Sequence, residues 1–135
     1  MKQDPVSEEL SPNAQDLYIF FGGISSGIAM PPFEFYKASQ IIDENKIFVR
    51  DLRQRWYQAG LPGVSNSIRG TAEFLRQRIQ CISPRKTYFV GNSMGGFAAI
   101  LFSSLLNEGM AIAFAPQTFI SRVLRRKYGD KRWSR

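Results

Sequence analysis

The segment from residue 86 to residue 106 constrains the fold of this chain more than any other. Residues 86–90 (KTYFV) are β-branched and aromatic, which is typical of a buried strand. Residues 91–95 (GNSMG) follow, and apolar side chains then recur at helical spacing, at Phe97, Ile100, Leu101, Leu105 and Leu106. The sequence therefore predicts a strand that turns directly into a helix.

This turn places one serine between two glycines. Gly91 and Gly95 stand two positions before and after Ser93, which leaves room for a crowded turn that presents the Ser93 hydroxyl above the sheet. The backbone N–H of Met94 would then face a developing oxyanion from the start of the helix. We interpret the motif as a nucleophile elbow, and the alternative is a plain strand-to-helix turn.

Further apolar runs alternate with helical patterns along the chain. Residues 17–21, 46–50 and 111–115 favour buried strands, and residues 31–42 and 67–81 favour helices. Ser65 or Ser67 could cap the second helix, and the first has apolar side chains at helical spacing, at Phe35, Ala38, Ile41 and Ile42. Alternation of this kind indicates a three-layer α/β/α sandwich with a short, mostly parallel sheet of about four strands. Ligands bind beyond the carboxyl ends of such strands, where Gly23, Asp51 and Ser93 all fall.

Composition and charge divide the chain into three parts. We expect residues 1–16 to form a mobile lead-in, residues 17–120 a single domain and residues 121–135 a basic tail. The formal net charge is +7, and seven Arg or Lys with one Asp between Arg122 and Arg135 supply +6 of it. A solvated tail is favoured over a phosphate-binding or acidic-surface-binding one, and nucleic acid is not the expected partner. No run of residues suits a leader or a membrane span, so a cytoplasmic location is the default.

The cysteine and histidine content excludes several kinds of site. Cys81 is the single cysteine and the chain has no histidine, so no internal disulfide and no zinc site is expected, and we expect Cys81 to pack at a helix end. Residues 22–27 and 91–96 match the first half of a phosphate-binding P-loop, but neither is followed by the required Lys and Ser or Thr. No cofactor is therefore predicted.

The long connection after the second strand carries aromatic and basic residues together. Trp56 and Tyr57 stand close to Arg50, Arg53 and Arg55, which could form a stacking and phosphate-binding surface or line the mouth of an active cleft. Packing of the loop against the domain is the favoured interpretation.

The chain resembles the α/β-hydrolase fold superfamily over roughly residues 17–120. The resemblance rests on the strand into Gly22 and Gly23, the strand into Asp51 and the elbow, and residues 30–35, 56–63 and 115–119 are similar to a little-characterised group of bacterial serine-esterase-like proteins. It implies that Ser93 is the nucleophile, that Met94 gives one oxyanion N–H and that Gly23 or Ile24 gives the second. A small acyl or ester substrate is the expected partner of such a site.

The resemblance also implies that the match is incomplete towards the carboxyl terminus. The acid and histidine of the superfamily follow later strands, and a serine hydroxyl without an adjacent base is a weak nucleophile. Asp51 lies at the right edge of the sheet, although a loop-capping role is favoured for it over that of a base. We expect weak or no activity from the chain alone. The alternative function is a non-catalytic interaction module that forms a homodimer or heterodimer across an exposed edge strand from Ala111 to Ala115.

Overall fold

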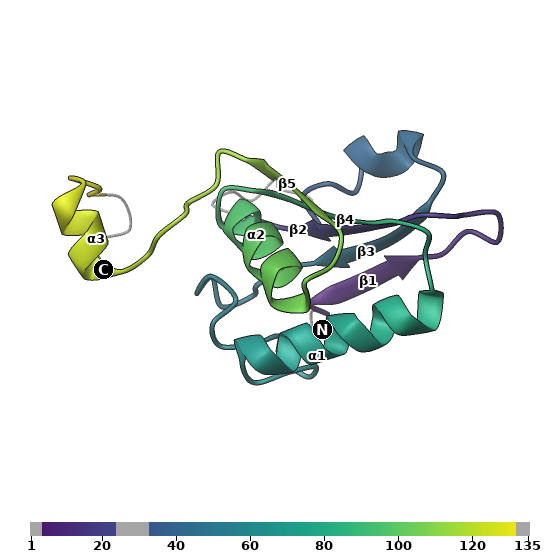
Figure 1. The fold of residues 1–135 in the computed structure, drawn as a ribbon, viewed down its shortest axis with the longest axis horizontal. Helices are drawn as coiled ribbons and strands as arrows, with labels where there is room; N and C mark the ends of the chain where they lie inside the picture. The colour runs from purple at the N-terminus through teal and green to yellow at the C-terminus, as the bar shows by residue number, and fades with distance from the viewer. Residues whose placement is uncertain (1–3, 24–32, 132–135) are drawn as a thin grey trace.

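The computed structural model describes residues 4–23 and 33–131, and a five-stranded sheet with helices is its main feature (Figure 1). In chain order the elements are β1 (Val6–Glu9), β2 (Leu17–Phe21), the 3-10 helix η1 (Ala38–Ile41), β3 (Asn45–Val49), α1 (Ile68–Ile82), β4 (Thr87–Asn92), α2 (Met94–Leu106), β5 (Met110–Phe114) and α3 (Arg122–Lys127).

The sheet confirms the α/β fold class expected from the sequence. Its strand order is β1-β3-β2-β4-β5, in which β2 pairs in parallel with both β3 and β4, and β5 pairs in parallel with β4. All four strands expected from the apolar runs are present within two residues of their expected ends. Since β2 is followed by β3 on one side and β4 on the other, the strand order reverses beside β2, which is where ligands bind in sheets of this class.

The fifth strand, β1, corrects the expectation that residues 1–16 form a lead-in without regular structure. It pairs antiparallel with β3, with Val6 opposite Val49, and Val6 also packs against the core. A bidentate ion pair joins Glu8 to Arg78 of α1, with N···O distances of 2.6 and 2.7 Å. These partners lie far away in the sequence, so no local pattern in a four-residue strand could indicate them.

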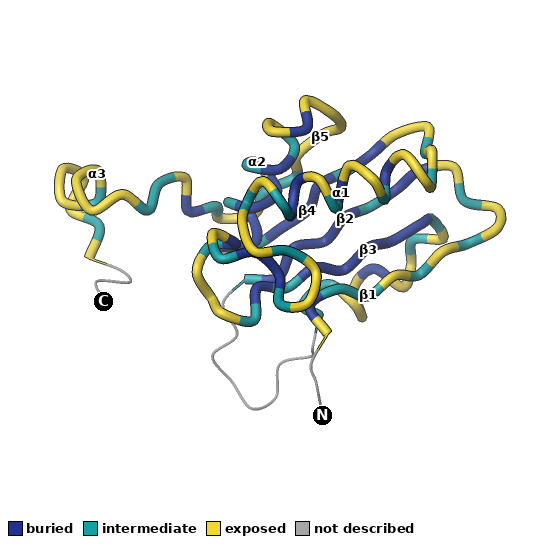
Figure 2. Tube along the Cα trace, turned by 90° about the horizontal axis from the view of Figure 1, so that it is seen from below, coloured by how far each residue is buried: buried dark blue, intermediate teal, exposed yellow. Residues whose placement is uncertain are grey.

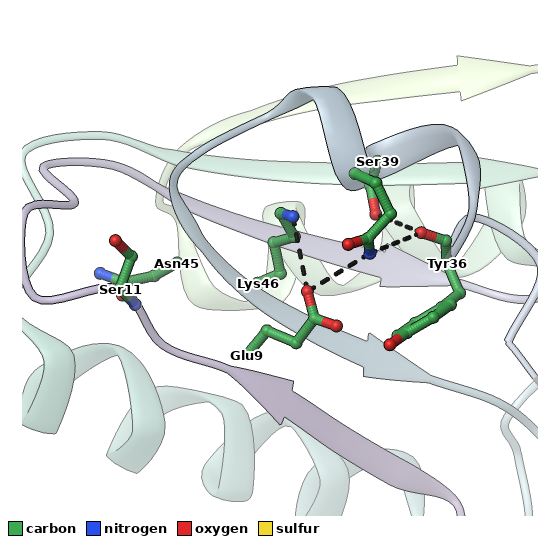
Figure 3. Close-up of polar contacts among 7 residues, drawn as sticks. Glu9, Ser11, Tyr36, Ser39, Asn45 and Lys46 are labelled. Carbon is green, nitrogen blue, oxygen red and sulfur yellow. Dashed lines mark hydrogen bonds and ion pairs between the residues drawn. The ribbon is translucent and has the colours of Figure 1, made fainter.

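Polar contacts hold the far end of β1 to the neighbouring strand. Figure 3 shows Glu9 facing Lys46 of β3, with a distance of 3.4 Å between the carboxylate oxygen and Nζ. Beyond the strand, the backbone N–H of Ser11 donates to Asn45 Oδ1 at 3.1 Å. Residues 6–11 are therefore part of the folded domain.

The larger part of the core lies between the sheet and the two long helices. Figure 2 shows β2, β3 and β4 as mostly dark, buried segments and α1 as a more exposed helix. Phe21 of β2 stacks on Phe102 of α2 with ring centroids 5.6 Å apart, and it meets the edge of the Tyr57 ring at 5.7 Å. Each of these three side chains is fully buried, so this face carries most of the hydrophobic stabilisation.

The opposite face of the sheet has a thinner cover. Phe20 and Phe48 stack with centroids 5.4 Å apart, and Phe35 covers Phe20 at the same distance. Of the helix expected over residues 31–42, the structure describes residues 33–42, which form turns and the single 3-10 turn η1. Ile41, one of the apolar positions at helical spacing, is 92% exposed. Phe33, Phe35 and Ile42 of this segment pack on the sheet, and the Tyr36 ring lies against that of Phe48 with centroids 5.5 Å apart.

Candidate functional site

The residues expected to form a site lie at one edge of the sheet, beyond the carboxyl ends of three adjacent strands. Gly23 follows β2, Asp51 follows β3 and Ser93 follows β4. The elbow therefore stands beside the point where the strand order reverses, and the loop after β2 lies against it.

Ser93 has the strained backbone that a nucleophile elbow requires. Its φ of 55° and ψ of −116° lie outside the conformations that a side chain normally allows, at a cost of about 1–3 kcal/mol. The surrounding backbone holds it there, because its N–H donates to the Phe114 carbonyl at 2.9 Å and its carbonyl accepts from the Phe97 N–H at 3.0 Å. The neighbouring strand β5 and the first turn of α2 together fix this conformation.

Close approach of backbone to backbone explains the two glycines of the motif. A Cβ on Gly91 would collide with the carbonyl group of Gly95, and a Cβ on Gly95 would collide with the carbonyl oxygen of Phe21. A larger residue at Gly91 would push the start of α2 away from β4, and one at Gly95 would push it away from β2. The glycines therefore serve the tight turn itself.

Met94 begins α2 directly after the serine. Its side chain is fully buried, and its N–H belongs to the first helical turn, whose donors have no partner within the helix. This donor lies at the positive end of the helix dipole, which suits stabilisation of an anion. The placement of Met94 is compatible with the role of oxyanion donor that the motif implies.

The other expected oxyanion donor is already bound to a carboxylate. The Gly23 N–H donates to Glu34 Oε2 at 2.7 Å, and the side-chain amide of Asn92 donates to Glu34 Oε1 at 2.9 Å. A Cβ built on Gly23 would lie 3.2 Å from Glu34 Oε2 and 3.7 Å from the Ser93 Cβ, so the carboxylate lies near the elbow. Sequence reasoning assigned no role to Glu34, and Ile24 lies outside the described residues.

Asp51 is used by its own loop. Its carboxylate oxygens accept the backbone N–H groups of Arg53 at 3.0 Å, Arg55 at 2.6 Å and Tyr57 at 2.8 Å, and the residue is only 5% exposed. These bonds favour the loop-capping interpretation of Asp51 over that of a base for Ser93.

Tyr57 anchors the same loop beneath the site. Its hydroxyl donates to the Gly22 carbonyl at 2.9 Å and approaches the Val49 carbonyl at 3.3 Å. Complete burial disfavours the phenolate, and the nearby Asp51 carboxylate adds repulsion, so the pKa of Tyr57 is raised well above its usual value. Tyr57 therefore packs the loop down, as expected, and also fixes the backbone after β2.

Cys81 lies in the last turn of α1, at the helix end where it was expected, but it is exposed, so the expectation that it packs there is wrong. Within residues 4–23 and 33–131, no group of His, Cys, Asp and Glu side chains could hold a metal ion, and no helix has the length and apolar character needed to cross a membrane.

Comparisons with solved structures find a similar fold in an O-acetyltransferase and in a carboxylesterase. The capsule O-acetyltransferase of Neisseria meningitidis serogroup A matches with a TM-score of 0.66 and 17% identity, over 93% of this chain and 53% of that protein. A carboxylesterase of the thaumarchaeon Nitrososphaera gargenis matches with a TM-score of 0.55 and 13% identity, over 92% of this chain and 46% of its own. At these identities the likeness shows a shared fold, loosely consistent with the α/β-hydrolase expectation.

A third match belongs to a protein assembly. The glycosylation-associated Gap123 complex of Streptococcus agalactiae gives a TM-score of 0.62 at 14% identity, over 92% of this chain and 26% of that one. The chain thus spans about half the length of the O-acetyltransferase and less of the other two. No protein-family model and no curated protein sequence matches it.

Proposed function

We propose that this chain is the elbow-bearing part of a serine acyl-transfer domain that acts on a small acyl or ester substrate. The observation that carries the proposal is the backbone of Ser93, which is held at φ 55° and ψ −116° between β4 and α2. Strain of this kind persists only where the surrounding structure enforces it, and it concentrates at functional sites. The O-acetyltransferase and carboxylesterase folds support the same chemistry.

In the proposed reaction the Ser93 oxygen attacks the carbonyl carbon of the substrate. A bond forms between that oxygen and carbon, the serine proton passes to a base, and the carbonyl oxygen becomes an oxyanion that the Met94 N–H stabilises. Collapse of the tetrahedral intermediate then breaks the bond to the leaving group, which takes up the proton. Loss of one such oxyanion donor typically lowers the rate by about 10²–10³.

The base is the component that the chain does not supply in an obvious form. The sequence contains no histidine, and the Asp51 carboxylate is bound by three backbone N–H groups of its own loop. We therefore propose that the base comes from outside these 135 residues and that Ser93 reacts only slowly without it.

Gly23 is the proposed second oxyanion donor, and its contact with Glu34 sets a condition on that role. The Gly23 N–H cannot bind a substrate oxyanion while it donates to the Glu34 carboxylate at 2.7 Å. The proposal therefore requires Glu34 to leave this position when a substrate binds, and Ile24 remains an alternative donor from the same loop.

Labelling with a fluorophosphonate probe tests the proposal. We expect slow labelling of the folded chain, mapped by peptide mass spectrometry to Ser93 and absent from the Ser93→Ala variant. Ser104 lies exposed on the same helix α2, so Ser104→Ala is the matched control and should label as the parent chain does. Folded protein that stays unlabelled, or label that maps to other serines, would overturn the assignment of Ser93.

The exposed edge of the sheet favours a second candidate function, that of an interaction module. Within the described part of the chain β5 pairs only with β4, and Met110 and Phe114 at its two ends are 59% and 54% exposed. The basic helix α3 lies away from β5 (Figure 1), so it does not cover this edge. An apolar edge strand of this kind is a template for pairing, so we propose a homodimer or heterodimer across β5.

Sedimentation analysis tests the dimer. We expect the parent chain to self-associate and the Met110→Lys/Phe114→Lys variant to be monomeric, because charged side chains on an edge strand oppose pairing. Leu105 of α2 is similarly exposed, at 49%, but does not lie on the edge strand. The control variant Leu105→Lys should therefore leave association unchanged. A parent chain that is monomeric at micromolar concentration would contradict the homodimer.

A further inference from the structure

A cavity of about 240 Å³ lies between the loop after β3 and the segment that leads into α3. The loop contributes Arg55, Trp56 and Gln58, and the later segment contributes Gln117, Ile120, Arg122 and Arg125. Three of these seven side chains carry guanidinium groups, so the cavity is cationic. Pockets for small organic ligands usually measure about 300–1,000 Å³, so this cavity suits one end of a ligand.

Two of the three guanidinium groups that line the cavity, those of Arg55 and Arg122, are not neutralised by carboxylates of the described residues. Among residues 4–23 and 33–131, no Asp or Glu lies within ion-pair distance of Arg55 or Arg122. The nearby Asp51 carboxylate is bound by backbone N–H groups, including that of Arg55 itself. The planar fork of an arginine matches the oxygens of a phosphate, and several arginines converging on one cavity favour a multiply charged anion.

Gln117 supplies a buried donor without a partner. It is only 6% exposed, and its Nε2 makes no hydrogen bond to any part of the chain that the structure describes. A buried amide in this state is costly unless a ligand oxygen accepts from it. The backbone N–H of Gln117 also approaches the Ser93 carbonyl at 3.5 Å, which places this wall of the cavity beside the elbow.

The loop that presents Arg55 and Trp56 is held in a conformation that its residues do not favour. Gln54, Trp56 and Tyr57 have φ values of 52°, 53° and 63°, in the left-handed region that glycine prefers. The Asp51 carboxylate and the buried Tyr57 hydroxyl fix this backbone through the hydrogen bonds described above. Strain that the fold maintains so thoroughly is frequent at ligand-binding sites.

We propose that this cavity binds the phosphate group of an organic phosphate ester. Arg55, Arg122 and Arg125 bind the phosphate oxygens, Gln117 donates to one of them, and Trp56 and Ile120 contact the apolar part next to the phosphate. The binding of a phosphate ester in this cavity does not depend on the proposed function. The further step, that the bound molecule is the acyl substrate or acyl acceptor of Ser93, rests on the proposed function.

Isothermal titration of the full chain with phenyl phosphate and with inorganic phosphate tests the site. We expect saturable binding of one phenyl phosphate per chain, with weaker binding of inorganic phosphate because it has no apolar part. In a Trp133→Phe background Trp56 is the only tryptophan, and its fluorescence should change with the same Kd. Failure to reach saturation with either compound would overturn the proposal.

A matched pair of double variants separates the cavity from general positive charge. Arg55→Gln/Arg122→Gln should raise the Kd for phenyl phosphate by about tenfold or more. Arg69→Gln/Arg126→Gln removes the same charge from exposed positions outside the cavity and should change it by less than about twofold. An equal rise in the Kd for phenyl phosphate in both double variants would show that a diffuse cationic surface binds the anion, and would contradict a defined site.

Two further results distinguish this proposal from others. Ser93→Ala should bind phenyl phosphate with an unchanged Kd. A parent chain that binds phenyl phosphate but is never labelled at Ser93 would overturn only the proposed function, and one that is labelled at Ser93 but does not bind phenyl phosphate would overturn only the site. A short single-stranded oligonucleotide should not displace phenyl phosphate. Tight oligonucleotide binding that the Arg69→Gln/Arg126→Gln variant also loses would indicate nucleic-acid association and contradict the proposal.

Discussion

The Glu34 carboxylate links Gly23 to the elbow: its Oε2 accepts from the Gly23 N–H at 2.7 Å, while its Oε1 accepts from the Asn92 side chain at 2.9 Å. One side chain thus ties the loop after β2 to the end of β4, immediately before Ser93. It also occupies the Gly23 N–H, which is expected to be the second oxyanion donor beside that of Met94.

Replacing Glu34 by alanine should have opposite effects on stability and on reactivity. The change leaves two donors without their acceptor, so the free energy of unfolding should fall by about 1–2 kcal/mol. It also frees the Gly23 N–H for an oxyanion, so fluorophosphonate labelling of Ser93 should become faster.

Glu44 offers the control for this variant, because its carboxylate also accepts two backbone N–H groups, from Gln15 at 2.7 Å and Asp16 at 2.8 Å, beside the amino end of β2. Glu44→Ala should lower stability similarly without changing the labelling rate. Slower labelling in Glu34→Ala would mean that Glu34 supports the site and does not block it.

Gly95 and Gly22 should respond differently to an added methyl group. A Cβ on Gly95 would collide with the Phe21 carbonyl, whereas the nearest atom to a Cβ on Gly22 is 3.6 Å away. Gly95→Ala should therefore lower the free energy of unfolding by about 3 kcal/mol or more, and Gly22→Ala should change it by less than about 1 kcal/mol. Urea unfolding measures both, and similar values for the two variants would refute the close packing of α2 on β2.

Glycine at position 93 should relieve the strain of the elbow. Ser93→Ala keeps a side chain at φ 55° and ψ −116°, whereas Ser93→Gly accepts this conformation readily. We expect the free energy of unfolding of the glycine variant to exceed that of the alanine variant by about 1 kcal/mol. At positions with ordinary backbone conformation, alanine is usually the more stabilising of the two residues. An alanine variant of equal or greater stability would show that the backbone at this position is unstrained.

Tyr57 should make the protein sensitive to alkaline pH. Burial raises the pKa of Tyr57 in the folded state, so its contribution to stability is complete below the unfolded pKa of about 10 and is lost as the pH rises above that value. Between about pH 8 and pH 11, the urea midpoint of the parent chain should therefore fall more steeply than that of Tyr57→Phe.

The phenylalanine variant has a second expected effect. It keeps the buried ring but loses the hydrogen bond to the Gly22 carbonyl, which should cost about 1–2 kcal/mol at neutral pH. Parallel pH profiles of the two proteins would show that the Tyr57 hydroxyl is accessible to solvent, against the structure.

The local features of the fold could be predicted because each depends on residues close in the sequence. The parallel strands follow from apolar runs, and the start of α1 follows from Ser67, whose hydroxyl accepts from the Gly70 N–H at 3.0 Å. The turn around Ser93 likewise follows from its two glycines. In each case the residues that determine the structure lie within a few positions of one another.

The remaining features depend on partners that are distant in sequence. β1 is stabilised by β3 and by the ion pair between Glu8 and Arg78, which are 70 residues apart. The contact of Glu34 with Asn92 spans 58 residues, and the cationic cavity joins Arg55 to Arg122. The spacing of apolar residues along the chain carries no information about such contacts. The sequence therefore indicated that a site is present but did not indicate which residues surround Ser93.

Chemical rescue of Ser93 by an added base tests the central claim most directly. The rate of fluorophosphonate labelling would be measured at increasing imidazole concentration and constant ionic strength, in the parent chain and in Ser93→Ala. If Ser93 is a correctly positioned nucleophile that lacks only its base, the labelling rate should rise in proportion to the concentration of unprotonated imidazole. Ser93→Ala should show no labelling at any imidazole concentration. A rate that does not respond to imidazole, in protein that remains folded, would contradict the account.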